Sequence, residues 1–223
     1  MKAMILAAGR GERLRPLTDT CPKPLLPLNG KPLIVYHLEK LAQAGVQDVV
    51  INYAWLGEQF EKTLGRGEGF GLNIHYSPEP EGGLETAGGI VQALPLLDSE
   101  PFILINGDVF SHYDFSLLSG KLKPDFLAHL VLVPTPEFKA NGDFGLQPPG
   151  LVVAQGDWTF SGISVIDPKL LINYPVGRLA LAPILREAMN RQLVSGETYA
   201  GLWSDIGTQA RLSATEHQIL NAD

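Results

Sequence analysis

The chain has 223 residues, a length that fits one large α/β domain better than two full domains. Hydrophobic residues make up 45% and charged residues 18%, which excludes a disordered or fibrous protein. The formal net charge of −7 argues against a nucleic-acid or membrane-surface binder, because such proteins carry a basic stripe. A small anionic ligand is still compatible with this charge, since a few local basic groups can reverse the field within a cleft.

Short apolar runs alternate with helix-like segments, which is typical of a Rossmann-like α/β fold with a mainly parallel sheet and helices on both faces. The strands are predicted at residues 2–7, 48–52, 73–76, 102–106, 127–133 and 160–165. The helices are predicted at residues 32–44, 55–64, 86–94, 182–190 and 208–220. Thr86 and Thr208 are the expected caps of two of these helices, and Pro95 is expected to follow the end of the first.

Residues 134–156 are rich in Pro, Gly and Asn, which predicts loops with a short hairpin. Together with the strand and helix that follow, they form a predicted insertion at about 134–200 that covers one side of the sheet. We therefore expect residues 1–223 to form a single domain.

Cysteine usage and hydropathy limit the cellular context. Cys21 is the only cysteine, so neither an intramolecular disulfide nor a thiolate metal cluster can form within the chain. The apolar run 3–8 is too short for a signal-peptide core, and no stretch approaches the ~20 apolar residues that cross a membrane. These features predict a cytoplasmic protein with no obligate protein partner, no nucleic acid and no membrane.

The loop at 6–24 follows the first predicted strand, and ligands bind beyond the carboxyl ends of such strands. Ala8, Gly9 and Gly11 remove bulk where a backbone must approach a ligand, and their amides can form a nest for phosphate oxygens. Leu14 stands where a dinucleotide-binding loop needs its third glycine, and the P-loop pattern is absent. The loop carries four cations of an acidic protein: Arg10, Arg13, Arg15 and Lys23.

A second group of polar residues follows the strand 102–106. Asn106, Gly107 and Asp108 place a carboxylate at a strand end beside a glycine that admits a ligand, which suits Mg²⁺. An Asx turn is the alternative interpretation of these three residues taken alone.

The full first-loop pattern Gly-x-Gly-x-Arg-x-x-Pro-x-Thr, followed by Pro-Lys-Pro, resembles the nucleotidyltransferases that activate sugar 1-phosphates. The resemblance covers nearly the whole chain and implies a GT-A-like fold. It implies that Gly9, Gly11 and Arg13 contact a nucleoside triphosphate and that Lys23 reaches its α-phosphate region. Further nucleotide contacts are expected from Ala8, Glu12, Glu85, Gly88 and Gly107.

The resemblance also implies a metal site and a sugar site. Asp205, in the segment Trp-Ser-Asp-Ile-Gly-Thr before the last helix, would join Asp108 in binding Mg²⁺, while phosphates and water supply the other ligands. Sugar contacts are expected from Asn106, Asp143, Gly145, Ser161 and Gly162. Residues 150–158 lack a Glu-Lys-Pro triplet that many relatives carry, so the wall of the sugar pocket must be built differently.

The implied reaction transfers a nucleotidyl group from an NTP to a sugar 1-phosphate and releases pyrophosphate. Because the attacking phosphate oxygen is already ionised, positioning and charge neutralisation carry the catalysis. Arg13 and Lys23 are the predicted catalytic residues, on the departing pyrophosphate and on the α-phosphate respectively.

The compact length, the Leu-Glu-Thr-Ala-Gly-Gly segment and the missing triplet most resemble family members that use UTP and N-acetylmuramate 1-phosphate in peptidoglycan recycling. Lys139 is the expected partner of the lactyl carboxylate of that sugar. The alternatives are GTP with mannose 1-phosphate, thymidylyl transfer to glucose 1-phosphate, cytidylyl transfer to phosphocholine, and a non-catalytic nucleotide-sugar sensor.

Overall fold

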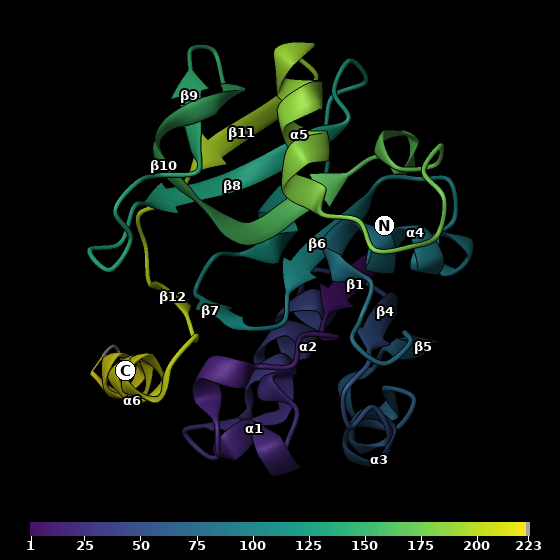
Figure 1. The fold of residues 1–223 in the computed structure, drawn as a ribbon, viewed down its shortest axis with the longest axis vertical. Coiled ribbons are helices and arrows are strands. Elements are labelled where there is room, and N and C mark those ends of the chain that lie inside the picture. Colours follow the sequence, from purple (N-terminus) through teal and green to yellow (C-terminus); the bar gives the residue numbers. More distant parts are fainter. Residues whose placement is uncertain (222–223) are drawn as a thin grey trace.

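A central β-sheet organises the computed structural model, which describes residues 1–221 (Figure 1). Its strands are β1 (Ala3–Leu6), β4 (Asp48–Tyr53), β5 (Asn73–Pro78), β6 (Phe102–Asn106), β8 (Ala128–Pro134), β9 (Phe144–Gln147), β10 (Leu151–Ile166) and β11 (Val194–Thr198). Their order across the sheet is β11-β8-β10-β6-β1-β4-β5, and β9 pairs with β10. Strands β6, β1, β4 and β5 are parallel, whereas β10 runs antiparallel to both β6 and β8.

The helices are α1 (Leu17–Thr20), α2 (Leu33–Gln43), α3 (Glu58–Leu64), α4 (Glu85–Leu97), α5 (Leu181–Asn190) and α6 (Gln209–Leu220). In the described part of the chain, none of them combines the length and the apolar character that a bilayer crossing needs. Two small ribbons lie outside the sheet: β2 (Pro27–Leu28) pairs with β3 (Lys31–Pro32), and β7 (Val109–Ser111) pairs with β12 (Trp203–Asp205).

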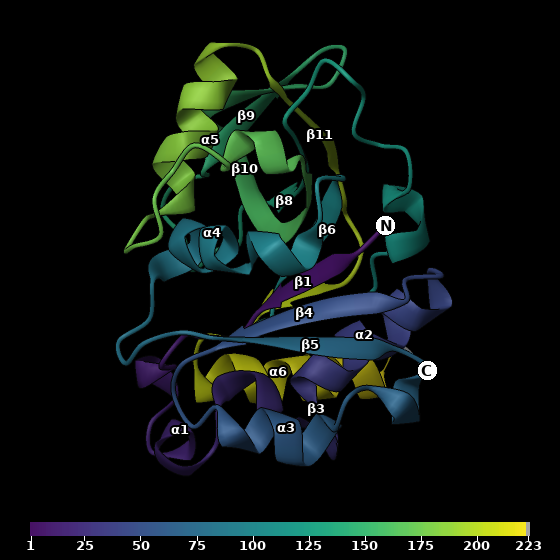
Figure 2. The ribbon, with the colours of Figure 1, turned by 90° about the vertical axis from the view of Figure 1, so that its right-hand side faces the viewer.

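Two apolar layers hold helices against opposite faces of the sheet, because side chains alternate along each strand. Ile5 of β1 packs in a cluster with α2 and α3, whereas its neighbour Met4 packs with α4 and α5. Both side chains are fully buried, and burial of one such side chain contributes about 1.5–3 kcal/mol. Figure 2 shows α4 and α5 in its upper half and α2, α3 and α6 in its lower half. The predicted α/β class with helices on both faces is confirmed.

Helix α4 differs from its sequence-based prediction at both ends. It begins at Glu85 rather than at a Thr86 cap, because Glu79 accepts from the amide of Leu84 just before the helix and the carbonyl of Leu179 accepts from the amides of Ala87 and Gly88. It also continues past Pro95 to Leu97, since a proline in the last turn removes only one hydrogen bond. Tertiary contacts therefore set the start of α4.

Residues 134–200 contribute β9, β10, α5 and β11, and the predicted hairpin is the β9–β10 pair. Strand β10 is longer than predicted and begins at Leu151. Strands β11, β7 and β12 were not predicted, because each is at most five residues long and β11 and β12 have only one apolar residue each. That residues 134–200 form an insertion within a single domain of residues 1–223 stays a prediction.

His37 lies fully buried on α2, stacked on Phe115, and its Nε2 has no hydrogen-bond partner among the described residues. Burial, together with the positive charge of Lys40, lowers the pKa of His37 from 6.5 to about 4. Between these two pH values the unfolded chain binds more protons than the folded chain. The free energy of unfolding therefore falls as the pH is lowered through this window.

We predict that acidification from pH 7 to pH 5 costs the protein about 2 kcal/mol through His37 alone. The variant His37→Phe should lose this part of the pH dependence, which urea unfolding at several pH values would measure. His217→Gln, at an exposed position of α6, is the control and should leave the pH dependence unchanged. An identical slope in wild type and His37→Phe would contradict the assignment.

Candidate active site

The first loop leaves β1 at Leu6 and turns under the carboxyl end of the sheet. The amide of Ala7 donates to Asn52 Oδ1 at the end of β4, 2.8 Å away. Gly11 adopts a left-handed conformation with φ of 70°, and its carbonyl accepts from the hydroxyl of Thr18. These contacts fix both ends of the loop. Its middle, Ala8 and Gly9, lines a cavity of about 300 Å³.

Two of the loop arginines, Arg10 and Arg13, lie in different environments. The guanidinium of Arg10 stacks 3.9 Å from the ring centre of Trp55 and pairs with Asp19 at 3.0 Å. Arg13 is exposed and lines a second cavity farther along the sheet edge. Glu12, predicted to contact nucleotide, is exposed beside it. Arg13 is therefore the loop cation with the freedom to meet a phosphate.

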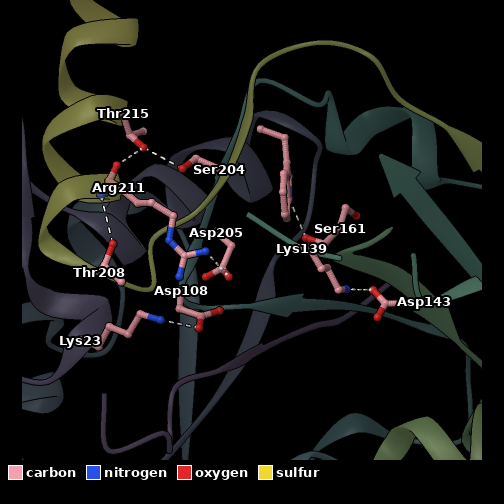
Figure 3. Close-up of polar contacts among 11 residues, drawn as sticks. Lys23, Asp108, Lys139, Asp143, Ser161, Ser204, Asp205, Thr208, Arg211 and Thr215 are labelled. Atoms are coloured by element: carbon pink, nitrogen blue, oxygen red, sulfur yellow. Dashed lines mark hydrogen bonds and ion pairs between the residues drawn. The ribbon is translucent and has the colours of Figure 1, made fainter. Parts of the chain in front are cut away.

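Lys23 lies close to Asp108, although they are far apart in the sequence. Lys23 begins a 3-10 turn after the first loop, and its side chain is only 9% exposed. Its Nζ lies 2.6 Å from Asp108 Oδ2, as Figure 3 shows. A buried ammonium requires such a partner, since an unpaired buried charge is costly. The predicted phosphate-binding lysine and the predicted metal-binding carboxylate thus form one ion pair.

Asp205 lies beside Asp108 through the β7–β12 ribbon. Asp205 pairs in register with Val109, and the amide of Ile206 donates to the Asp108 carbonyl at 3.0 Å. Arg211 of α6 contacts Asp205 Oδ2 at 3.1 Å, and Figure 3 shows the two side chains pointing toward each other. The guanidinium of Arg211 also stacks 4.2 Å from the ring centre of Phe138. Arg211 was not predicted as a site residue from the sequence. The sequence signal that could have found Arg211 is its position in the first turn of the helix that Thr208 caps.

A buried hydrogen-bond chain positions the turn before α4. Asn52 Nδ2 donates to Glu79 Oε1 at 2.6 Å, and the amide of Leu84 donates to Glu79 Oε2 at 2.7 Å. Asn52 and Glu79 are both buried. The chain thereby ties the end of β4 to the turn that carries Glu85, which is exposed and pairs with Arg178 at 3.6 Å. Neither Asn52 nor Glu79 was a predicted site residue.

Two predicted nucleotide contacts, Gly88 and Gly107, serve close packing in this structure. A Cβ on Gly88 would lie 2.0 Å from the carbonyl oxygen of Gly177. A Cβ on Gly107 would lie 2.7 Å from the carbonyl oxygen of Leu6. Only glycine fits at either position. Their predicted contacts with nucleotide stay predictions.

Of the predicted sugar residues, Asn106, Asp143 and Ser161 line the cavities at the end of β6, whereas Gly145 lines none of them. Asp143 Oδ2 accepts from Lys139 Nζ at 2.5 Å and from the amide of Phe160 at 3.0 Å. The hydroxyl of Ser161 donates to the carbonyl of Val131, so it is already satisfied within the sheet. Gly145 is buried on β9 beneath β10, and Gly162 packs against the side chain of Asn106.

Three cavities meet at Asn106. The loop cavity lies between Ala8, Lys23 and the turn before α4. The aspartate cavity lies between Arg13, Asp108, Asp205 and Arg211. The α5 cavity lies between Phe144, Phe160 and helix α5. Asn106 lines all three, so ligands in the loop and α5 cavities would approach one another beside the two carboxylates.

The two aspartates suit a hard divalent cation that takes most of its ligands from elsewhere. Both carboxylates line the aspartate cavity, and each is neutralised by a cation, Asp108 by Lys23 and Asp205 by Arg211. Within residues 1–221, no group of three or more His, Cys, Asp or Glu side chains could enclose a metal ion by itself. Carboxylate oxygens are suitable Mg²⁺ ligands, and Mg²⁺ usually keeps waters and substrate phosphates. The residues therefore fit the predicted ion.

Comparison with known proteins agrees with this geometry. Residues 2–147 match the family model described as nucleotidyl transferase. The chain belongs to the nucleotidyl transferase family. It is 51% identical to an N-acetylmuramate alpha-1-phosphate uridylyltransferase of Neisseria meningitidis, with 97% of each chain covered. It is 33% identical to a protein of the same name from Caulobacter vibrioides, with 95% of this chain and 94% of that one covered.

The fold has a solved counterpart in a Bacillus anthracis protein assigned as a glucose-1-phosphate thymidylyltransferase, whose crystal structure contains sucrose. The two structures superpose with a TM-score of 0.87 over 98% of this chain and 94% of the other, at 22% identity. This similarity shows the nucleotidyltransferase fold predicted from the first loop. The chain is accordingly a nucleotidyltransferase by family and by fold.

We predict that Glu79→Gln weakens both the fold and nucleotide binding. Both partners of Glu79 donate, so the amide nitrogen of glutamine would face a donor and leave it unsatisfied. We expect a loss of about 1–3 kcal/mol in the free energy of unfolding and a several-fold higher KM for the nucleotide. Chemical unfolding and steady-state kinetics measure the two effects. Glu81→Gln, at an exposed position of the same turn, is the control, and equal behaviour of both variants would refute the role of Glu79.

Proposed function

We propose that this chain transfers the uridylyl group of UTP to N-acetylmuramate 1-phosphate, forming UDP-N-acetylmuramate and pyrophosphate. The observation that carries the proposal is the 51% identity to the Neisseria meningitidis uridylyltransferase over 97% of both chains. It is supported by the presence of Lys23, Asp108 and Asp205 around adjoining cavities. We expect the reaction to take place in the cytoplasm, where UTP is available.

The reaction is a substitution at phosphorus. An oxygen of the sugar phosphate attacks the α-phosphorus of UTP, and the bond from that phosphorus to the oxygen bridging to the β-phosphate breaks. Pyrophosphate leaves with the electron pair of that bond. The nucleophile is ionised near neutral pH, so the reaction needs no general base. The obstacle is the approach of two anions, which fixed positive charges overcome.

The residues have distinct proposed roles in this reaction. The amides of Ala8 and Gly9 would face the triphosphate, since both residues line the loop cavity. Lys23 would hold the α-phosphate as charge accumulates on it, and Arg13 would stabilise the departing pyrophosphate. Such preorganised cations typically contribute about 10²–10³ in rate. Asp143 and the other residues of the α5 cavity would hold the sugar.

Sugar-phosphate nucleotidyltransferases generally use a divalent metal, and we propose Mg²⁺ held by Asp108 and Asp205. When bound, Mg²⁺ would neutralise and orient the phosphates. Lys23 and Arg211 pair with these carboxylates at 2.6 and 3.1 Å. A divalent ion would compete with both cations for the same oxygens, which would leave Lys23 available to a phosphate.

We predict that Asp108→Ala abolishes turnover, with at least about a 10³-fold loss, while the chain stays folded. The Asp108 side chain is 38% exposed, so its removal leaves no core cavity, although the loss of the partner of buried Lys23 should lower the free energy of unfolding. Pyrophosphate release measures the activity, and circular dichroism measures the fold. Asp125→Ala, at an exposed position, is the control and should keep full activity. Retention of most activity in Asp108→Ala would refute the metal assignment.

The substrate assignment is tested by pyrophosphate release across a grid of four NTPs and several sugar 1-phosphates with Mg²⁺. We expect UTP with N-acetylmuramate 1-phosphate to give the dominant signal. A dominant signal from GTP with mannose 1-phosphate would keep the chemistry and overturn the substrate. If no combination releases pyrophosphate but the protein binds a nucleotide sugar tightly, the proposed catalysis would be overturned and a sensor role would be favoured.

A further inference from the structure

The α5 cavity has a wall that the sequence analysis did not anticipate. It encloses about 430 Å³, within the range of about 300–1,000 Å³ that small-molecule sites occupy. Apolar side chains form most of this wall: Phe144, Phe160, Leu181 and Leu185. Arg186 is the only cation among the residues that line it. One positive charge therefore faces a largely apolar space next to Asn106.

Arg186 is held in place and is free of an acidic partner. It lies on the exposed side of α5, and its guanidinium carbon stands 5.6 Å from the ring centre of Phe144, which is buried. Such a cation–π contact orients a guanidinium without using its N–H donors. Within residues 1–221 no carboxylate lies within 4.0 Å of Arg186.

The neighbouring cations are already paired with carboxylates. Lys139, the expected partner of the lactyl carboxylate, lies 2.5 Å from Asp143. Arg178 lies 3.6 Å from Glu85. Glu85 and Asp143 both line the α5 cavity, and their pairing uses the charges of Arg178 and Lys139. Arg186 is the lining cation that has no carboxylate partner in the described part of the chain, and it can meet a second anionic group on the sugar.

The chemistry of Arg186 suits a carboxylate in particular. A guanidinium offers a planar fork of N–H donors that matches a carboxylate with two parallel hydrogen bonds. N-acetylmuramate differs from N-acetylglucosamine by a lactyl ether that ends in a carboxylate. We propose that Arg186 binds this carboxylate and thereby selects N-acetylmuramate over the neutral N-acetyl sugar. The inference rests on the proposed function and extends it to a specificity-determining residue.

Calorimetric binding of the two product nucleotides tests the inference without turnover. Wild type should bind UDP-N-acetylmuramate about tenfold or more tightly than UDP-N-acetylglucosamine. Arg186→Gln should lose about ten- to hundredfold in affinity for the first, the range for a hydrogen bond to a charged group, and nothing for the second. Arg186→Lys keeps the positive charge without the planar fork of donors. Its affinity for UDP-N-acetylmuramate should lie between those of wild type and Arg186→Gln. In Arg186→Gln, the KM for N-acetylmuramate 1-phosphate should rise while kcat stays unchanged.

Two control variants separate a role in selection from a role in structure. Arg191→Gln removes another arginine just beyond the end of α5, outside the cavity, and should bind both nucleotides like wild type. Lys139→Gln tests the alternative cation and should keep the preference for the acidic sugar. The inference is overturned if Arg186→Gln weakens both nucleotides equally, leaves both unchanged, or if Lys139→Gln alone abolishes the preference.

The outcome for wild type distinguishes this inference from the proposed function. If wild type shows no preference between the two nucleotides, the sugar assignment of the proposed function fails, and the role of Arg186 fails with it. If wild type prefers the acidic sugar and Arg186→Gln keeps that preference, only the role of Arg186 is refuted.

Discussion

The pairing of β1 with β6 is the constraint on which the site depends. After β1 the chain builds β4 and β5 on one side and then returns to place β6 on the other. Leu6 and Asn106 are in register, and the amide of Gly107 donates to the Leu6 carbonyl at 2.9 Å. Any side chain at position 107 would separate the two strand ends. Ligand sites in open α/β sheets form where the strand order reverses, and here the first loop and Asp108 emerge at that point.

Charge balance explains how an acidic chain can prepare a site for anions. Asp108 holds Lys23 inside the protein, because burial of that ammonium is tolerable only beside a carboxylate. Asp205 holds Arg211 in the same manner, and α6 carries this arginine back to the sheet edge. Both carboxylates are thus neutralised without a ligand. In the proposed function, Asp108 and Asp205 would hold a divalent ion, and Lys23 and Arg211 would then be available to phosphates.

The sequence predicted the parts of the fold that follow from local patterns. Buried parallel strands are continuous apolar runs, so the strands around 2–7 and 102–106 were found close to their observed bounds. The first loop was found because its glycines and cations lie close together in the chain. Residues such as Glu79, Arg186 and Arg211 were missed, since their roles depend on partners that only the folded chain brings near. The predicted start of α4 was wrong for the same reason, because the carbonyl of the distant Leu179 accepts the amides of Ala87 and Gly88 in its first turn.

The three cavities that meet at Asn106 are lined by different elements of the fold. The first loop and the turn before α4 line the cavity proposed for the nucleotide, the ends of β6 and β12 supply the carboxylates, and α5 forms a wall of the remaining space. Neither Asp108 nor Lys23 is among the residues that line the α5 cavity, so exposed side chains of α5 can change without replacing a member of the ion pair. In the proposed function, sugar selection by α5 would therefore be separable from phosphoryl chemistry. Because function resides in sites carried by a fold, one sheet edge can keep its reaction while its sugar changes.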